Sequence, residues 1–270
     1  MSVLVVIPAR YASSRYPGKP LVALEGATGE AKTLIRRSWD AALAAKGVDR
    51  VVVATDDKRI AEHAVCFGAE VVMTSEECAN GTERCADALS RLGEKPEIVV
   101  NLQGDAPLTP SWFVENLIAG LRADKDADLA TPVLRCDGKA LSALLLDRKS
   151  GRVGGTTAVF GSKRDALYFS KEVIPFTSKL YLDEEKTPVF HHVGLYAYRP
   201  DALRAYVGWP VGPLETLEGL EQLRFIENGK RVLCVEVDGK GRAFWELNNP
   251  EDVPRIEAML KQMEQRSALP

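Results

Sequence analysis

Short hydrophobic runs alternate with segments of helical spacing through the first half of the chain. The runs are almost entirely apolar, which is the pattern of strands buried on both faces of a parallel sheet. The predicted strands are residues 3–7, 50–54, 70–73, 98–102 and 128–133, and the predicted helices are residues 33–46, 58–67, 82–92 and 112–122. We therefore predict an α/β fold with a mostly parallel central sheet, flanked by helices and joined by right-handed crossovers.

After residue 135 this regular alternation stops, and a small mixed or antiparallel lobe is predicted. Its elements and those that follow are strands at 151–160, 193–198 and 231–237, a polar mobile loop at 179–188, and a helix at 250–265 capped by Asn248 or Asn249. No repeat, low-complexity tract or linker divides the sequence. We therefore expect a single domain over residues 1–270, with an inserted lobe at about residues 150–212.

Leucines recur at every third position from Leu214 to Leu223. Glutamates follow them one position along, at Glu215, Glu218 and Glu221. This spacing predicts one amphipathic helix over residues 214–228, with an apolar leucine face and a solvated acidic side.

Composition and charge narrow the class of protein. Of the 270 residues, 46% are hydrophobic and 27% charged, which is ordinary for a globular protein with a real core. The net charge of −3 gives no sign of a surface for nucleic acid or for an anionic membrane. The five cysteines form no C-x-x-C pair, which indicates free thiols in a reducing compartment. No run reaches the roughly 18 to 20 apolar residues of a membrane helix, and no signal peptide is visible, so we predict a cytoplasmic protein.

A cationic loop follows the first predicted strand. It carries Arg10, Arg15 and Lys19, and Pro17 and Gly18 shape its end. Ligands of open α/β sheets bind at the carboxyl ends of strands. Arginine forks grip phosphate oxygens in pairs, and lysine adds a point charge. We interpret the loop as a seat for a polyphosphate; the alternative is a surface loop with solvated charges.

A carboxylate follows the strand at residues 98–102. The segment reads N-L-Q-G-D-A-P, so that Asp105 comes directly after the flexible Gly104. Mg²⁺ prefers oxygen ligands and often binds one or two carboxylates together with substrate phosphates. A Gly-Asp pair is also a common turn, but its position on a neighbouring parallel strand favours a metal site opposite the cationic loop.

Two further segments carry candidate chemistry. In N-G-T-E-R, Gly81 allows the backbone to approach a ligand, and Arg84 is unexpected because cations are disfavoured in the first turn of a helix. The adjacent His191 and His192 point to opposite faces of a strand, which argues against a metal pair. One of them faces a pocket, or both are packed structural histidines.

Two nucleotide-binding motifs are incomplete. Residues 26–33 read G-A-T-G-E-A-K-T, which places Ala31 where a P-loop needs glycine. No G-x-G-x-x-G follows the first strand, which argues against a nicotinamide-cofactor enzyme.

Taken together, the motifs resemble those of the CMP-Kdo synthetases, where Kdo is 3-deoxy-D-manno-octulosonate. The matching segments are I-P-A-R-Y-A-S-S-R-Y-P-G-K-P, V-A-T-D-D, N-G-T-E-R, N-L-Q-G-D-A-P, A-L-Y-F-S-K, H-V-G-L-Y-A-Y-R and L-E-G-L-E-Q-L-R. The resemblance implies a nucleotide-diphospho-sugar transferase-like Rossmann-type fold. It also implies a Mg²⁺-dependent cytidylyltransferase that converts CTP and Kdo to CMP-Kdo and pyrophosphate for lipopolysaccharide synthesis, as a cytoplasmic homodimer.

The resemblance also implies roles for single residues. Arg10, Arg15 and Lys19 would hold the CTP phosphates, and Asp105 would hold Mg²⁺; Arg10, Lys19 and Asp105 are the expected catalytic residues. Arg84 and Gln103 would lie near the cytosine, and the sugar acid would contact His192, Tyr196, Glu221 and Gln222.

The chain departs from this family at its second metal position. Asn248 stands where the family usually has a metal-binding aspartate, so the site loses one negative charge. Mg²⁺ could still bind through the Asn248 carbonyl, through waters or with help from Glu246. Ala106 and Lys171 replace a usual glutamate and a usual arginine.

Several alternatives stay open. The sugar acid could be 8-amino-Kdo or a sialic-acid-like acid. The departures from the family's motifs leave the inference of a CTP-binding site stronger than the inference of which sugar acid is bound. Asn248 also motivates a non-catalytic nucleotide-binding protein. No residue stands out as a general base.

Overall fold

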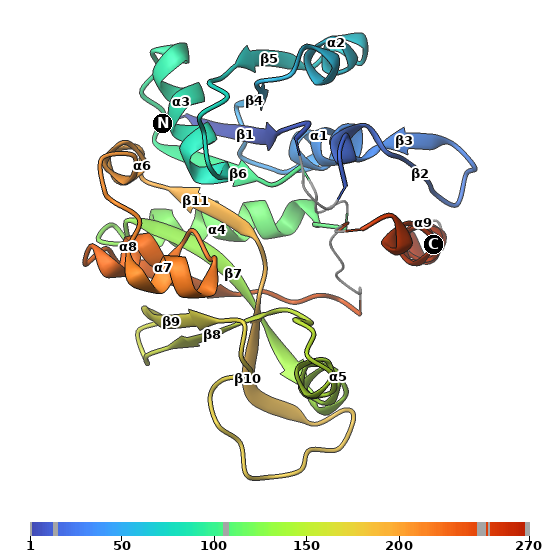
Figure 1. Cartoon of the computed structure of the whole chain (residues 1–270), viewed down its shortest axis with the longest axis vertical. Helices are drawn as coiled ribbons and strands as arrows, with labels where there is room; N and C mark the ends of the chain where they lie inside the picture. The colour runs from blue at the N-terminus through green and yellow to red at the C-terminus, as the bar shows by residue number, and fades with distance from the viewer. Residues whose placement is uncertain (1, 13–15, 105–107, 242–246, 248, 268–270) are drawn as a thin grey trace. The chain divides into compact units, whose positions relative to one another are not determined.

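A computed structural model describes residues 2–12, 16–104, 108–241, 247 and 249–267 (Figure 1). The chain forms two compact units. The first consists of Met1–Glu115 and Gly239–Pro270, and the second of Asn116–Asp238. The second unit therefore interrupts the sequence of the first. The expected single domain with a lobe at about residues 150–212 stays a prediction.

The first unit contains a parallel sheet. Its strands, in spatial order, are β5 (Glu70–Met73), β4 (Arg50–Thr55), β1 (Val3–Ala9) and β6 (Ile98–Leu102). Residues Val3 to Ile7 are at most 1% exposed, as expected for a strand covered on both faces. The predicted strands and their parallel arrangement are confirmed.

Three helices join these strands, close to their predicted positions. They are α1 (Leu34–Ala44), α2 (Lys58–Cys66) and α3 (Gly81–Leu92). The Asp57 carboxylate begins α2 by accepting from the backbone N–H of Arg59 at 2.9 Å, and Asn80 begins α3 by accepting from that of Glu83 at 2.8 Å. Gly93, in a left-handed conformation, ends α3.

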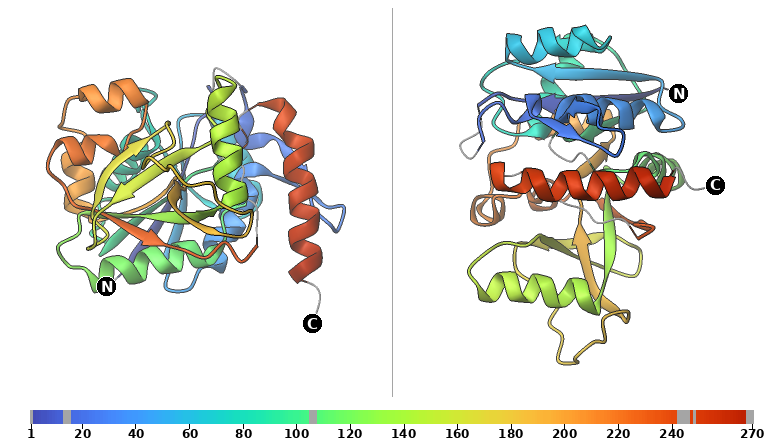
Figure 2. Two further views of the ribbon diagram at one scale, coloured as in Figure 1. Left: turned by 90° about the horizontal axis from the view of Figure 1, so that it is seen from below. Right: turned by 90° about the vertical axis from the view of Figure 1, so that its right-hand side faces the viewer.

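The incomplete P-loop at residues 26–33 lies in a β-hairpin. Strands β2 (Ala23–Glu25) and β3 (Ala31–Thr33) pair antiparallel, and α1 follows β3 directly. The glycine-rich segment is therefore the turn of a hairpin and not the loop between a strand and a helix that a P-loop needs. The C-terminal helix α9 (Val253–Ser267) lies beside this hairpin (Figure 2). A short 3-10 turn, Pro250–Asp252, precedes α9, and Asn249 caps it together with Asp252, as one of the two predicted caps.

The second unit is built on the long strand β7 (Leu129–Asp137). Along one edge β7 pairs antiparallel with β10 (Lys186–His192) and β11 (Leu195–Tyr198), and along the other it pairs parallel with β12 (Val232–Glu236). Strand β10 continues antiparallel to β8 (Thr156–Phe160), and β8 to β9 (Ala166–Ser170). The predicted mixed or antiparallel region is therefore confirmed.

The helices of the second unit were predicted less well. They are α5 (Gly138–Lys149), α6 (Pro200–Tyr206), α7 (Pro213–Glu218) and α8 (Leu223–Glu227); α4 (Ser111–Ala123) runs across the boundary between the units. Helix α5 could not be recognised from its spacing because it has no clean apolar face: Leu145 and Leu146 are exposed. No helix in the described part of the chain could span a membrane.

The prediction of one helix over residues 214–228 is wrong. Helix α7 ends at Gly219, whose φ of 61° is left-handed, and α8 begins four residues later. Glu215 is buried instead of solvated, while Leu217 is 82% exposed. The leucine spacing therefore did not mark a buried face.

Two smaller corrections concern the same unit. The polar stretch 179–188 is not a loop throughout, because β10 begins at Lys186. The strand predicted over 193–198 begins only at Leu195, and the preceding residues turn between β10 and β11. Polar composition at the surface end of a strand resembles that of a loop, which explains the first error.

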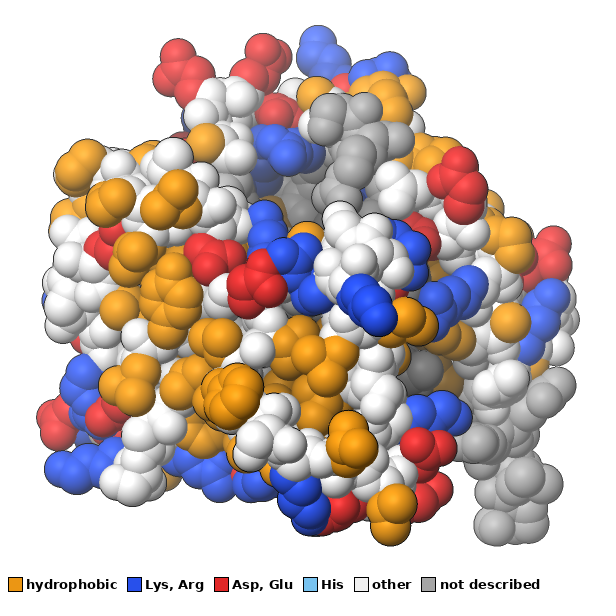
Figure 3. Space-filling model, turned by 60° about the horizontal axis from the view of Figure 1, so that its bottom comes forward, with side chains coloured by type: hydrophobic (Ala, Val, Ile, Leu, Met, Phe, Trp, Pro, Cys, Tyr) orange, Lys and Arg blue, Asp and Glu red, His pale blue; other side chains and the backbone are white. Residues whose placement is uncertain are grey.

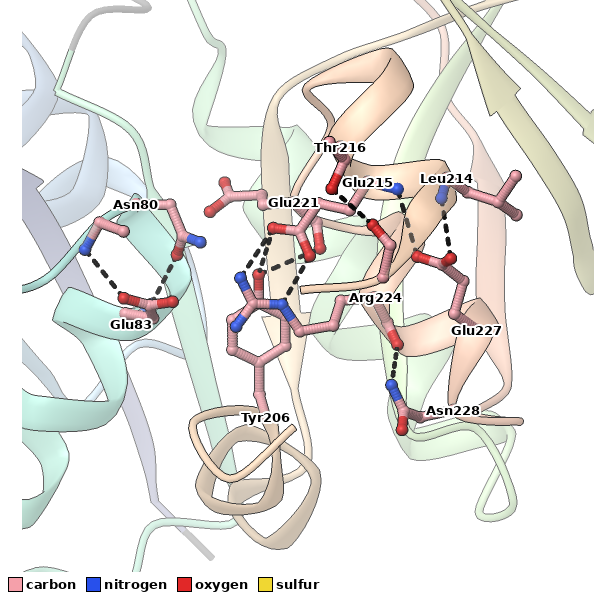
Figure 4. Close-up of polar contacts among 12 residues, drawn as sticks. Asn80, Glu83, Tyr206, Leu214, Glu215, Thr216, Glu221, Arg224, Glu227 and Asn228 are labelled. Carbon is pink, nitrogen blue, oxygen red and sulfur yellow. Dashed lines mark hydrogen bonds and ion pairs between the residues drawn. The ribbon is translucent and has the colours of Figure 1, made fainter. Parts of the chain in front are cut away.

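A buried ion pair explains the position of Glu215 (Figure 4). Arg224 donates from Nε to Glu215 Oε2 at 2.6 Å and from Nη2 to Oε1 at 2.8 Å. The guanidinium carbon lies 4.1 Å from the centre of the Tyr206 ring. Nearby, the Glu227 carboxylate accepts from the backbone N–H groups of Leu214 and Glu215 at the start of α7.

Replacing Arg224 with methionine should strongly destabilise the protein. The change leaves the Glu215 carboxylate buried without its cation, which costs about 3 to 5 kcal/mol in comparable cases. Arg204→Met is the matched control, since its ion pair with Asp201 is exposed and should contribute less than about 1 kcal/mol. Urea unfolding of both variants measures the difference, and equal losses would contradict the role of the buried pair.

Candidate active site

The carboxyl ends of β1, β4 and β6 meet at one edge of the parallel sheet in the first unit. We predicted that the strand before Arg10 and the strand before Asp105 are neighbours. This is confirmed, because β1 pairs directly with β6. After β6 the backbone passes close to β1: a Cβ built on Gly104 would lie 3.1 Å from the Pro8 carbonyl oxygen. Glycine is therefore needed at position 104 for this approach.

The cationic loop begins at this edge. Arg10 is exposed, Lys19 is half-buried at the start of a 3-10 turn (Lys19–Leu21), and Arg15 lies outside the described residues. The Gly18 N–H donates to the Tyr11 carbonyl at 2.9 Å, which joins the two ends of the loop. Gly18 has a φ of +72°, and a Cβ there would lie 3.1 Å from the Tyr11 ring.

Arg59 holds the tyrosine of this loop. Its guanidinium carbon lies 3.3 Å from the centre of the Tyr11 ring, and its Nη2 donates to Asp57 Oδ2 at 2.6 Å. Because Asp57 also caps α2, the cationic loop is tied to the start of that helix.

Arg84 is anchored within the first unit. It is 3% exposed, and it donates from Nη2 to Asp56 Oδ2 at 2.8 Å and from Nη1 to Thr74 Oγ1 at 2.6 Å. Asp56 follows β4 and Thr74 follows β5, so Arg84 joins the carboxyl ends of these two strands. The carboxylate of Asp56 explains why a cation is tolerated in the first turn of α3.

Gln103 lies beside the start of α3. A Cβ built on Gly81 would lie 3.6 Å from Gln103 Nε2, 3.3 Å from Asn101 Nδ2 and 3.6 Å from Pro8 Cγ. Gly81 therefore lets α3 approach the ends of β1 and β6. The structure brings together the elements that carry Arg10, Arg84 and Gln103.

The predicted metal ligands Asp105 and Asn248 lie outside the described residues, as does Glu246. Within the described ranges, no group of three or more His, Cys, Asp or Glu residues could hold a metal ion. The carboxylate of Asp105 and the amide oxygen of Asn248 are donors of the kind that Mg²⁺ prefers.

The predicted sugar-acid residues lie in the second unit. His192 is 6% exposed, and its Nε2 lies 2.8 Å from Thr131 Oγ1. Its ring packs edge-on against Phe169, with 4.9 Å between ring centres, and lies 5.7 Å from the Tyr196 ring. Burial lowers the pKa of His192 to about 3, with a smaller effect of the neighbouring His191.

His191 has different neighbours. A Cβ on Gly155 would lie 2.8 Å from His191 Nε2, and burial lowers the pKa of His191 to about 4. The prediction that the two histidines face opposite sides of a strand is consistent with the alternation along β10.

Tyr196 and Gln222 form one hydrogen-bonded pair. The Tyr196 hydroxyl donates to Gln222 Oε1 at 3.0 Å, and Gln222 is 1% exposed. Among the described residues, Gln222 Nε2 is buried and has no hydrogen-bond partner. A buried donor of this kind is suited to a ligand acceptor.

Glu221 is half-buried in the segment between α7 and α8, next to Gln222. Its backbone carbonyl accepts from the Tyr206 hydroxyl at 3.2 Å. The second unit thus brings Tyr196 together with His192 and with Gln222. Glu221 lies next to Gln222 in the sequence.

Comparison with known proteins identifies the family. The family model described as cytidylyltransferase matches residues 4–232. A 3-deoxy-manno-octulosonate cytidylyltransferase from Maricaulis maris is 46% identical over 260 residues, which cover 96% of this chain and 97% of that protein. The chain belongs to the 3-deoxy-manno-octulosonate cytidylyltransferase family. The resemblance seen in the motifs and the predicted enzyme class, a nucleotidyltransferase, are confirmed.

Further members of the 3-deoxy-manno-octulosonate cytidylyltransferase family are also similar to this chain over most of its length. The protein of that name from Chlamydia pneumoniae is 40% identical over 252 residues, covering 93% of this chain and 91% of that protein. A solved structure of CMP:2-keto-3-deoxy-manno-octonic acid synthetase complexed with CTP superposes with a TM-score of 0.81 and 31% identity. It covers 98% of this chain and 100% of that one, so the predicted fold class is confirmed.

Three residues that make polar contacts within their own units were missed from the sequence. They are Asp56, which binds Arg84; Thr131, which contacts His192; and Glu218, which accepts from Ser170 Oγ at 2.7 Å. The signal for Thr131 was available, since it is a polar residue inside a predicted apolar strand. Glu218 had none, because its partner lies 48 residues away in the sequence.

Acid should weaken the fold through His192. Its pKa is lowered to about 3 in the folded protein and lies near 6.5 when unfolded, so the unfolded chain binds the extra proton as the pH falls below 6.5. The unfolding free energy should fall by about 1.4 kcal/mol between pH 7.5 and 5.5 for this one group. His191 adds a loss in the same direction.

Urea unfolding at the two pH values measures this effect. His192→Gln, which removes the titrating ring, should lose about 1.4 kcal/mol less than the unmodified chain over the same interval. An identical pH dependence in both proteins would show that His192 is not held neutral.

Proposed function

We propose that this protein transfers the CMP group of CTP to Kdo, releases pyrophosphate, and thereby supplies CMP-Kdo for lipopolysaccharide synthesis. The single observation that supports this most is the pairing of β1 with β6. It sets the strand that leads into the cationic loop beside the strand that leads to Gln103 and Asp105. The names of the relatives and the CTP complex of the structural neighbour agree with this substrate pair.

In the proposed reaction, the hydroxyl on the anomeric carbon of Kdo attacks the α-phosphorus of CTP and loses its proton to solvent water. The bond from that phosphorus to the bridging oxygen breaks, and pyrophosphate leaves with the electron pair. Arg10, Arg15 and Lys19 stabilise the negative charge that builds on the leaving group. The Gly18–Tyr11 hydrogen bond and the contact of Arg59 with Tyr11 fix the described ends of this loop, which limits the reorganisation of those ends during the reaction.

The nucleotide base is proposed to lie near Gln103 and Arg84. The Gln103 amide beside the start of α3 can donate and accept, as cytosine recognition requires. The guanidinium of Arg84 is fixed by Asp56 and Thr74, so its orientation is set before the nucleotide binds.

The residues proposed to hold Mg²⁺ are Asp105 and Asn248. When bound, the ion supplies charge that orients the α-phosphate and eases deprotonation of the attacking hydroxyl. Because Asn248 is neutral, we propose weaker metal affinity than in relatives with an aspartate at this position.

The sugar acid is proposed to contact His192, Tyr196, Glu221 and Gln222. The buried Gln222 Nε2 offers a donor for an oxygen of the sugar acid. Neutral His192 cannot pair electrostatically with the carboxylate, so other groups must recognise that charge.

A pyrophosphate-release assay with CTP, Mg²⁺ and a panel of sugar acids tests this function. Kdo should give the fastest turnover, ahead of 8-amino-Kdo and sialic acid. CTP binding without pyrophosphate release from any acid would favour a non-catalytic nucleotide-binding protein instead. Asp105→Asn should lower turnover by orders of magnitude at fixed Mg²⁺, since it removes the carboxylate proposed to bind the metal.

Asp201→Asn is the control for this variant, because its carboxylate is on the surface of α6, with a side chain that is 99% exposed. Its turnover should equal that of the unmodified enzyme. Near-normal turnover of Asp105→Asn would remove Asp105 from the proposed mechanism.

We further propose that the protein is a cytoplasmic homodimer. Large apolar side chains of the second unit are exposed. Phe176, Leu180 and Leu182 lie in the segment that precedes β10, Leu146 lies on α5 and Leu167 lies on β9. Phe176 and Leu180 are 89% and 94% exposed. Figure 3 shows hydrophobic side chains gathered on the face that this view brings forward. Apolar surface of this kind is typical of an interface between subunits.

The double variant Phe176→Asp, Leu180→Asp should convert the dimer to a monomer, because two carboxylates would be desolvated in the interface. Sedimentation velocity measures the mass. Val65→Asp is the control, as it changes an exposed apolar residue of the first unit and should leave the dimer intact. A monomeric unmodified protein, or a dimer unaffected by the double variant, would rule this interface out.

A further inference from the structure

The hydroxyl of Thr131 has three polar neighbours within the second unit. Thr131 lies on β7 and is fully buried. Its Oγ1 lies 2.9 Å from the Leu195 carbonyl oxygen, 3.4 Å from the Val193 carbonyl oxygen and 2.8 Å from His192 Nε2. His192 ends β10, Leu195 begins β11, and Val193 lies in the turn between them.

The Leu195 carbonyl oxygen is the nearer of two carbonyl acceptors for the proton of this hydroxyl. A carbonyl oxygen can only accept, so the 2.9 Å contact between Thr131 Oγ1 and the Leu195 oxygen requires the hydroxyl proton to lie between them. The Thr131 oxygen is then left as an acceptor for its contact with His192. His192 Nε2 must therefore carry a hydrogen.

The rest of the environment keeps this ring neutral. His192 is buried between Phe169 and Tyr196, and burial holds its pKa near 3. A neutral ring with a hydrogen on Nε2 has a lone pair on Nδ1. Among the described residues, no hydrogen bond engages Nδ1.

We infer that Thr131 is a positioning residue, which fixes the Nε2–H tautomer of His192 so that Nδ1 accepts a hydrogen bond from a hydroxyl of the sugar acid. This inference rests on the proposed function, which places His192 at the sugar acid. It also assigns a binding preference to His192. Because a neutral acceptor binds hydroxyl groups and repels a carboxylate, His192 contacts the polyol part of the substrate.

The tautomer can be measured directly on the unmodified protein without substrate. Long-range ¹H–¹⁵N correlation spectra at pH 7 distinguish a protonated ring nitrogen from an unprotonated one. The chain has three histidines, and His192→Gln identifies the signal of His192. We expect a protonated Nε2 and an unprotonated Nδ1; a protonated Nδ1 would overturn the inference.

Kinetics of Thr131 variants test the consequence for the substrate. Thr131→Val removes the acceptor for Nε2–H, so the KM for Kdo should rise at least tenfold while the KM for CTP stays within twofold. Thr131→Ser keeps the hydroxyl and should restore the KM for Kdo to within about threefold of the unmodified value. A KM for Kdo in Thr131→Val equal to that of the unmodified enzyme would contradict the inference.

Thr187→Val is the matched structural control. Thr187 is also a buried threonine of this sheet, and its hydroxyl donates to the Cys136 carbonyl at 2.8 Å. Loss of this hydrogen bond should lower stability but should not raise the KM for Kdo relative to the KM for CTP. A rise in the KM for Kdo alone would show that general loosening of the sheet explains the Thr131 result.

The two proposals fail in distinguishable ways. Absence of turnover with Kdo in the unmodified enzyme would reject the proposed function, while the tautomer spectrum would still decide the role of Thr131. If Thr131→Val does not fold, the spectrum of the unmodified protein alone decides between the tautomers.

Discussion

The parallel pairing of β1 with β4 and β6 is the constraint on which the first unit depends. The carboxyl ends of these three strands therefore lie at one edge of the sheet. The cationic loop follows β1, Asp56 follows β4 and Gln103 follows β6. Two glycines then permit the close approaches that a side chain would block. Gly104 lets the backbone pass the Pro8 carbonyl, and Gly81 lets α3 approach Asn101 and Gln103. The site geometry therefore follows from strand pairing and the absence of two Cβ atoms.

Several buried polar side chains in the second unit bind one another in pairs. Thr131 pairs with His192, Tyr196 with Gln222, and Arg224 with Glu215. An unpaired polar group would be costly in this apolar surrounding, so each partner restricts the orientation of the other. The aromatic rings that pack between these pairs add a rigid frame, seen in the stacking of Tyr198 and Tyr206 on Phe225.

The anchoring of Arg84 shows how a residue can serve structure and ligand binding together. Its ion pair with Asp56 joins the ends of β4 and β5, and this explains a cation at a helix start without any ligand. The proposed contact with cytosine would use a guanidinium whose position is already fixed. In the same way, Arg59 fixes the cationic loop through Tyr11, although it lies on a different element.

The sequence by itself determined the parallel sheet of the first unit and helices α1 to α3, because these elements follow from local apolar periodicity and from caps such as Asp57 and Asn80. It did not predict the β2–β3 hairpin. It also identified the family, since the motifs are contiguous segments. The tertiary structure decided what depends on distant residues. Gly219 divides the predicted helix over 214–228, and Arg224 draws Glu215 into the interior. Likewise, only the fold brings Thr131 to His192, 61 residues away, because spacing along the chain carries no information about such contacts.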